Sequence, residues 1–282
     1  MDAPHARLDA ARLFHSAEWR VQAITRRIRA FNYGNALRQD VTLLSSAGYP
    51  VAARVVRPEG DGPLPALVVS PAIHHGCAAL ETHQSIVSAT ELAALGFVVI
   101  VHDPAGRGET WGEEDFGGPE QQDDLETTLR YARARPDVAS VGVLSLSFGV
   151  VAAAPVLARV DGVRWLVDWE GPSDREVVTT GGTRLLPADG HALDDEEYWC
   201  SREAVRHVGR LKCGYVRLQA APDHAQLYDL RHARRLIDAA QTAPWFQLNN
   251  HPRGLRPDSP RWISGGPLAA NRAILAKLAE LR

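Results

Sequence analysis

The chain has 282 residues, 45% of them hydrophobic, which suffices for a sizeable core, and we expect a single domain over residues 1–282. Its 31 basic and 34 acidic residues are intermixed and leave a net charge of −3, so neither nucleic acid nor an anionic membrane is an expected partner. The first residues contain no apolar signal segment, and no apolar run reaches the ~20 residues of a membrane helix, which together predict a cytoplasmic protein.

The first elements along the chain are a helix and a hairpin. Apolar residues recur at three- and four-residue spacings from Phe14 to Phe31, which predicts an amphipathic N-terminal helix within residues 1–34. Two β-rich runs follow at 41–44 and 51–56, and the Ala-Gly-Tyr-Pro sequence between them is typical of a turn. These runs predict an antiparallel hairpin.

From residue 66 onwards, short apolar runs alternate with helical stretches. Strands that are apolar on both faces are typical of a parallel sheet covered on both sides. The sequence therefore predicts an α/β fold with a mostly parallel sheet of about eight strands. The expected further strands are 66–69, 97–101, 138–144, 163–167, 215–218 and 246–248, and the expected helices are 83–95, 121–135, 148–160, 227–240 and one from Pro267 onwards.

Two segments interrupt this regular alternation. Pro155 lies inside the third expected helix, which must therefore kink or be shorter than drawn. Residues 170–209 are rich in Gly, Asp and Thr and have little periodicity. We interpret this stretch as a small cap insertion over the carboxyl ends of the strands.

The apolar run that ends in Ser147 has the pattern of a nucleophile elbow, where a buried strand turns sharply into a helix. Small residues, Ser145 and Gly149, flank the serine at two residues' distance, as the tight turn requires. A helix starting after Ser147 directs free N–H groups, including that of Phe148, toward an oxyanion formed there. The alternative is an ordinary turn or helix N-cap serine.

A serine nucleophile needs a general base and a carboxylate that orients the base, and both are available downstream. Asp223 follows the strand at 215–218, and His251 follows the strand at 246–248. Loops at the carboxyl ends of parallel strands open on the same edge of the sheet as the elbow. Three other acids lie after the preceding strand, and one other histidine adjoins the proposed acid. These alternatives are Asp168, Glu170, Asp174 and His224.

In these features the chain resembles the α/β-hydrolase superfamily, from the hairpin to the last helix. The order serine, acid, histidine matches the family's order, and residues 102–110 resemble its Asp-x-x-Gly-x-Gly-x-Ser turn. The resemblance implies Ser147 as the nucleophile, Asp223 as the acid and His251 as the base. It also implies an oxyanion hole made by the N–H of Phe148 with that of Ala72 or Ile73. The latter two lie in a loop that departs from the family's usual His-Gly sequence.

The resemblance predicts a serine hydrolase that cleaves carboxylic esters of small-molecule substrates. Serine at the elbow disfavours the epoxide hydrolase, haloalkane dehalogenase and typical dienelactone hydrolase chemistries. The hairpin and the Glu-Tyr-Trp stretch resemble the branch with prolyl-oligopeptidase-like domains and related esterases, so a serine peptidase or amidase is the nearest alternative. A non-catalytic binding protein on the same fold is a further alternative.

The substrate itself stays open at this level. Trp169, Tyr198 and Trp199 are candidates for an apolar substrate site, although aromatic residues near strand ends often serve as core packing. No cofactor or metal is expected, because a serine mechanism needs none and the histidines at 74, 75, 83 and 102 match no zinc motif. The three cysteines do not suggest a disulfide framework. The sequence does not determine the oligomeric state, and it is compatible with a homo-oligomer.

Overall fold

A computed structural model of the chain describes residues 36–60, 62–81, 85–179, 194–226 and 229–282. The expected N-terminal helix and the middle of the expected cap lie outside these residues. Within the described ranges, no helix is both long and apolar enough to span a bilayer.

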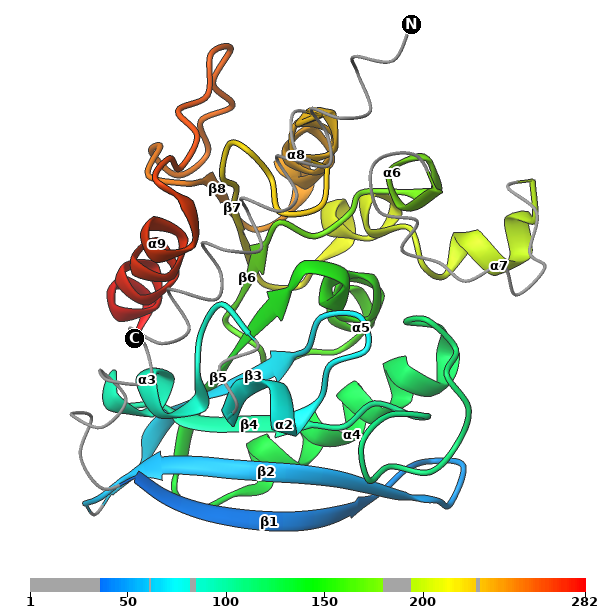
Figure 1. Ribbon diagram of the computed structural model, residues 1–282, viewed down its shortest axis with the longest axis vertical. Coiled ribbons are helices and arrows are strands. Elements are labelled where there is room, and N and C mark those ends of the chain that lie inside the picture. The colour runs from blue at the N-terminus through cyan, green and yellow to red at the C-terminus, as the bar shows by residue number, and fades with distance from the viewer. Residues whose placement is uncertain (1–35, 61, 82–84, 180–193, 227–228) are drawn as a thin grey trace, which may run out of the picture.

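One eight-stranded sheet organises the molecule (Figure 1). Its order is β1-β2-β4-β3-β5-β6-β7-β8; β2 runs antiparallel to β1 and β4, and all other neighbours are parallel. The mostly parallel α/β sheet predicted from the sequence is confirmed. The strands are β1 (Ala36–Leu44), β2 (Pro50–Pro58), β3 (Leu64–Ser70), β4 (Val98–His102), β5 (Val138–Leu146), β6 (Trp165–Trp169), β7 (Gly214–Leu218) and β8 (Phe246–Leu248).

Helices connect these strands. The α-helices are α2 (Cys77–Glu81), α3 (Ala89–Ala94), α4 (Pro119–Ala134), α5 (Val150–Arg159), α6 (Arg175–Thr179), α7 (Glu196–Cys200), α8 (Arg231–Ala239) and α9 (Gly266–Leu281). The described ranges also contain the short 3-10 helices η1 (Ser147–Gly149), η2 (Ala204–Arg206), η3 (Val208–Arg210) and η4 (Ala240–Thr242).

Helix α3 is shorter than the expected 83–95 because a capping box fixes its start. The Ser88 hydroxyl accepts a hydrogen bond from the Glu91 N–H at 3.2 Å, and the Glu91 carboxylate accepts one from the Ser88 N–H at 2.8 Å. Such reciprocal bonds satisfy two backbone donors that an unfinished helix end leaves free. Pro155 lies inside α5, which spans Val150–Arg159 and is therefore shorter than the expected 148–160.

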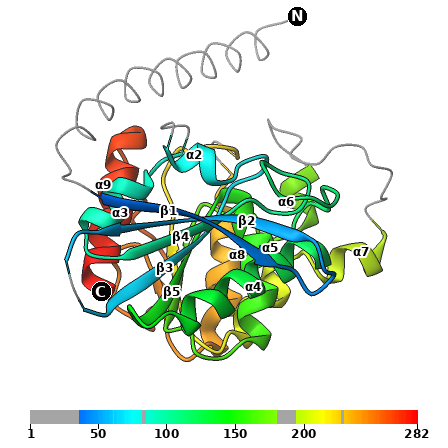
Figure 2. The same cartoon turned by 90° about the horizontal axis from the view of Figure 1, so that it is seen from below.

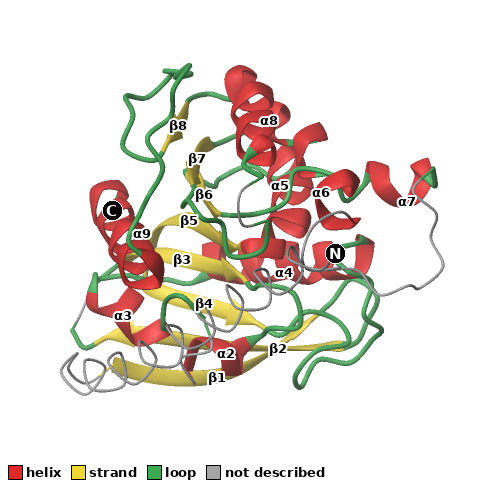
Figure 3. Ribbon diagram, turned by 45° about the horizontal axis from the view of Figure 1, so that its top comes forward, coloured by secondary structure: helices red, strands yellow, loops and turns green. Residues whose placement is uncertain are grey.

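The helices cover both faces of the sheet (Figures 2 and 3). On one face, buried side chains of α4, α5 and α8 pack against alternate residues of the central strands, such as Val68, Ile100 and Val143. On the other face, α2, α3 and α9 pack against the intervening residues, such as Leu67 and Val99. The central strands are buried on both faces, which explains their nearly continuous apolar sequence.

Candidate active site

Ser147 occupies a sharp turn at the carboxyl end of β5. Its φ is +51°, a left-handed conformation that costs energy for a residue with a side chain. At Gly149, an added Cβ would lie 2.3 Å from the carbonyl oxygen of Ser70, so the turn is pressed against the end of β3 and only glycine fits there. This is the elbow that the sequence predicts, with η1 starting at the serine.

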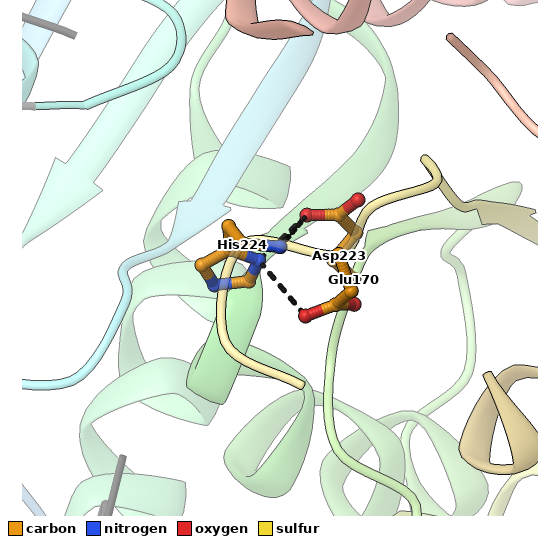
Figure 4. Close-up of side chains that lie close together, drawn as sticks. All are labelled: Glu170, Asp223 and His224. Atoms are coloured by element: carbon orange, nitrogen blue, oxygen red, sulfur yellow. Dashed lines mark hydrogen bonds and ion pairs between the residues drawn. The ribbon is translucent and has the colours of Figure 1, made fainter. Parts of the chain in front are cut away.

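The residue that meets the Ser147 hydroxyl is His224. Its Nε2 lies 2.8 Å from Ser147 Oγ, and its Nδ1 lies 2.6 Å from Glu170 Oε2. Figure 4 shows His224 beside the carboxylates of Glu170 and Asp223, with dashed lines to both. A hydroxyl, an imidazole and a carboxylate bonded in series form the arrangement that activates a serine nucleophile.

The structure does not bring His251 to Ser147, so that part of the sequence-based prediction is corrected. The Nε2 of His251 accepts a hydrogen bond from the backbone N–H of Arg261 at 3.0 Å. Its backbone carbonyl accepts another from Gln247 Nε2 at 2.7 Å. His251 thus binds its own loop, because the chain after β8 folds back on itself rather than toward the elbow.

Asp223 lies beside the histidine, but it is not the carboxylate that is hydrogen-bonded to it. Its Oδ1 is 3.7 Å from His224 Nδ1, and this oxygen accepts hydrogen bonds from the N–H groups of Ala225 and Gln226 at 2.7 and 2.8 Å. Its Oδ2 accepts one from Gln219 Nε2 at 2.7 Å. Glu170, and not the predicted acid Asp223, therefore makes the hydrogen bond to the His224 ring.

Glu170 follows β6 directly and has a φ of +50°, a left-handed conformation that is uncommon for a residue with a side chain. Its Oε1 accepts a hydrogen bond from the Ala220 N–H at 2.9 Å, while Oε2 faces His224. Its side chain is almost fully buried, with 1% exposed. These bonds fix the carboxylate at the imidazole.

The other two acids considered for the orienting role have different partners. Asp168 is fully buried and receives hydrogen bonds from Arg217 Nη1 at 2.6 Å and from the Tyr215 hydroxyl at 2.7 Å. Asp174 is bound by the Arg235 guanidinium at 2.9 Å. Of the four acids weighed from the sequence, Glu170 and Asp223 contact His224.

The charges around His224 favour its protonated form. Burial opposes protonation, but the hydrogen bond to Glu170 and the negative charges of Glu170 and Asp223 outweigh it and raise the pKa of His224 to about 9. Burial and the charge of Asp223 raise the pKa of Glu170. For Asp223, burial is outweighed by the contacts with His232 and His224, which hold its pKa below the usual range. The site therefore concentrates negative charge around one imidazole.

The predicted oxyanion-hole residues lie where the elbow meets the β3 loop. Phe148 is in the first turn of η1, where an N–H has no acceptor within its own helix. The Ser70 hydroxyl donates to the Gly149 carbonyl at 2.8 Å, and the Ala72 carbonyl accepts from Arg107 Nη1 at 3.1 Å. Within the described ranges, the N–H groups of Ala72 and Ile73 donate no hydrogen bond, so both stay candidates beside Phe148.

The three aromatic residues predicted to bind substrate lie in different surroundings. Trp169 lines a cavity together with Glu170 and His224. Tyr198 and Trp199 are buried, and the guanidinium of Arg202 stacks 3.8 Å above the Tyr198 ring. The cavity that Trp199 borders measures about 10 Å³, room for one water at most. The structure therefore places Trp169, but not Tyr198 or Trp199, at a usable cavity beside the histidine.

Among the described residues, the acids and the histidine of this site also form a group that could hold a metal ion. One ligand atom each from Glu170, Asp223 and His224 lies within 4.8 Å of the others. His224 Nδ1, however, is hydrogen-bonded to Glu170 and its Nε2 to Ser147, which engages both ring nitrogens in the serine arrangement.

Glu170 and His224, two residues that the structure links to Ser147, were not the first choice from the sequence. Glu170 carried a usable signal, an acid directly after a buried strand, and His224 carried another, a histidine on the loop after the next strand. Both were among the alternatives. Spacing and topology favoured Asp223 over Glu170, and chain order after Asp223 favoured His251 over His224.

Comparison with known proteins agrees with the fold. The family profile described as X-Pro dipeptidyl-peptidase (S15 family) matches residues 47–190, just over half of the chain, and this range includes the elbow. A search of curated protein sequences gave no significant match.

Several solved structures share the fold at low sequence identity. The Pyrococcus furiosus esterase Pf2001 is 13% identical with a TM-score of 0.59, covering 76% of this chain and 82% of its own. A Mycobacterium tuberculosis puromycin-hydrolysing peptidase is 17% identical with a TM-score of 0.64, covering 86% of this chain and 38% of its own. An acylaminoacyl peptidase is 13% identical with a TM-score of 0.64, covering 88% and 42%. With its α/β-hydrolase fold and the family match across the elbow, the chain belongs to the X-Pro dipeptidyl-peptidase (S15) family of serine hydrolases.

Proposed function

We propose that the chain hydrolyses carboxylic esters through an acyl-enzyme formed on Ser147, with His224 as the general base and Glu170 as the orienting acid. The observation that carries this proposal is the continuous hydrogen-bond series from Ser147 Oγ through both ring nitrogens of His224 to Glu170 Oε2. Both links are at or below 2.8 Å, within the range for proton transfer.

The reaction begins when neutral His224 removes the Ser147 proton as the hydroxyl oxygen attacks the ester carbonyl. The developing oxyanion is stabilised by the N–H of Phe148 and by that of Ala72 or Ile73. Collapse of the tetrahedral intermediate breaks the carbonyl–oxygen bond, and His224 returns its proton to the departing alcohol. Water, deprotonated by the same histidine, then attacks the acyl-enzyme and releases the acid.

Glu170 contributes by holding the ring and stabilising its positive charge. A carboxylate bonded to Nδ1 selects the tautomer whose Nε2 faces the serine, and it stabilises the imidazolium that forms during attack. The hydrogen bond from the Ala220 N–H keeps Glu170 oriented for this role. Glu170 thus replaces Asp223 in the acid position proposed from sequence.

A serine peptidase or amidase is the second candidate, and the family match favours it because its profile is described as an X-Pro dipeptidyl-peptidase. An amide uses the same nucleophile, base and oxyanion donors. It differs in the leaving group, since an amine must be protonated before it departs.

A fluorophosphonate probe tests the proposal directly, because it reacts covalently with an activated serine. We expect labelling of the wild-type chain and none of Ser147→Ala. Ser145→Ala serves as the control, since Ser145 is a fully buried neighbour in the same motif, and it should still be labelled if folded. Absence of labelling in folded wild type would refute catalysis by Ser147.

A comparison of matched substrates decides between ester and amide hydrolysis. A nitrophenyl ester and an aminoacyl nitroanilide with the same acyl group report the two activities under one assay. We expect the ester to be turned over faster. Cleavage of the anilide alone would show that the chain is a peptidase or amidase and would overturn the ester assignment.

A further inference from the structure

A cavity of about 110 Å³ opens beside the proposed general base. It is bordered by Trp169 at the end of β6, by Pro222 and His224 in the loop after β7, by Ile86, and by Pro267 and Ala270 at the start of α9. Apart from His224 and Glu170, its walls are apolar or backbone. Nothing in the mechanism above uses this space.

The walls are held together by hydrogen bonds between distant parts of the chain. The Ala221 N–H donates to the Ile263 carbonyl at 2.8 Å, and the Ile263 N–H donates to the Gln219 carbonyl at 3.0 Å. These two bonds tie the loop that carries His224 to the segment that leads into α9. From α9, the Asn271 side chain donates to the Ile86 carbonyl at 2.9 Å. The cavity is therefore built by fixed elements on three sides.

The position of the cavity shows which part of a substrate it faces. An ester bound for attack places its carbonyl oxygen at the oxyanion donors and its leaving oxygen at the base, because the base must return a proton to it. The cavity is lined by His224 and by none of the residues of the oxyanion loop 70–76 or by Phe148. It lies on the leaving-group side.

We propose that this cavity binds the alcohol portion of the ester and selects a short apolar alcohol. This inference rests on the proposed function, because it assumes that His224 protonates the leaving oxygen. A cavity of about 110 Å³ has room for a short chain of a few carbon atoms, such as a butyl group. Each CH₂ buried against the apolar walls stabilises the bound ester, whereas both oxygens of Glu170 already accept hydrogen bonds, from Ala220 and from His224.

Two ester series test the assignment. The first keeps an acetyl group and lengthens the alcohol from methyl to octyl; the second keeps a methyl alcohol and lengthens the acyl group. In the first series, we expect kcat/KM to rise about fourfold per CH₂ up to butyl and then to stop rising or fall.

Two variants change the cavity in opposite directions, so that loss of folding cannot imitate the expected result. Ala270→Leu fills the cavity, and the preference for butyl over methyl acetate should drop about tenfold or more. Ile86→Ala enlarges it, and the optimum should move to longer alcohols. Ala276→Leu, an exposed position on the same helix, is the matched control and should leave both series unchanged.

Each alternative result has a definite meaning. A change confined to the acyl series would show that the cavity binds the acyl group and would overturn the proposal. Unchanged series in both variants, with fluorophosphonate labelling of Ser147 retained, would overturn it while leaving the proposed function intact. Absence of fluorophosphonate labelling in the folded wild-type chain would instead refute the proposed function on which this inference rests.

Discussion

His224 is bonded to a serine hydroxyl on one side and faces two carboxylates on the other. Three buried acids, Asp168, Glu170 and Asp223, share this region with one buried guanidinium, that of Arg217. The excess of negative charge favours a proton on the imidazole, and the pKa of His224 rises to about 9. The proposed base is therefore mostly protonated at neutral pH.

This electrostatic arrangement predicts an alkaline pH profile. Because a base must be neutral to accept the serine proton, kcat/KM should increase with pH through a midpoint near 9. Asp223→Asn removes one negative charge 3.7 Å from Nδ1, which should lower the pKa of His224 and move the midpoint down by about one to three pH units. The measurement is kcat/KM of a nitrophenyl ester from pH 6 to 10.

The control for this experiment is Asp238→Asn, which removes an acid of a half-exposed surface ion pair with Arg256. It should leave the midpoint unchanged. Superimposed profiles for wild type and Asp223→Asn would contradict the electrostatic account. Loss of activity of Asp223→Asn at every pH would instead assign the orienting role to Asp223.

At the scale of single elements, β6 and β7 are joined by a buried ion pair beneath the site. Arg217 Nη1 lies 2.6 Å from Asp168 Oδ2, both side chains are fully buried, and Arg217 also donates to the Gly171 carbonyl at 2.8 Å. Gly171 follows Glu170 directly. The pair therefore supports the turn that carries the proposed acid.

Removing one partner of such a pair leaves an uncompensated buried charge. Arg217→Met should lower the free energy of unfolding by about 3–5 kcal/mol. Arg256→Met breaks the half-exposed pair with Asp238 and should cost about 1 kcal/mol or less. Urea denaturation of both variants measures the difference. Equal losses in the free energy of unfolding would show that the buried pair stabilises the fold no more than the surface pair does.

The elements differ in how well the sequence predicts them. Strands such as β4 and β5 are buried on both faces, so their apolar runs identify them directly. The start of α3 was misplaced because the capping box at Ser88 and Glu91, rather than the apolar pattern, sets it. Arg217 lies within a strand expected to be apolar, and β6 continues past its expected end at residue 167 to include Asp168. The interior accommodates both side chains because their opposite charges are paired.

At the scale of the whole molecule, the parallel sheet brings the ends of β5, β6, β7 and β8 to one edge. This topology predicts that a serine, an acid and a histidine meet there, but several strand-end loops offer each residue type. The choice depends on how each loop backbone is held by its hydrogen bonds. Asn249, for example, accepts a hydrogen bond from the Gln219 N–H at 2.8 Å and donates one to the Arg261 carbonyl at 2.8 Å. These two bonds tie the start of the loop that carries His251 to Gln219 and Arg261. No periodic pattern encodes such contacts.

The central claim is that His224, and not His251, is the base for Ser147, and paired histidine variants test it most directly. The measurement is kcat for a nitrophenyl ester in His224→Gln and His251→Gln, with folding checked by thermal denaturation. Glutamine at 251 can still accept the Arg261 N–H, so the loop is preserved. The account predicts that His224→Gln loses roughly 10⁴-fold in kcat while His251→Gln stays within a few-fold of wild type. A folded His251→Gln variant that loses activity, beside an active His224→Gln, would contradict it.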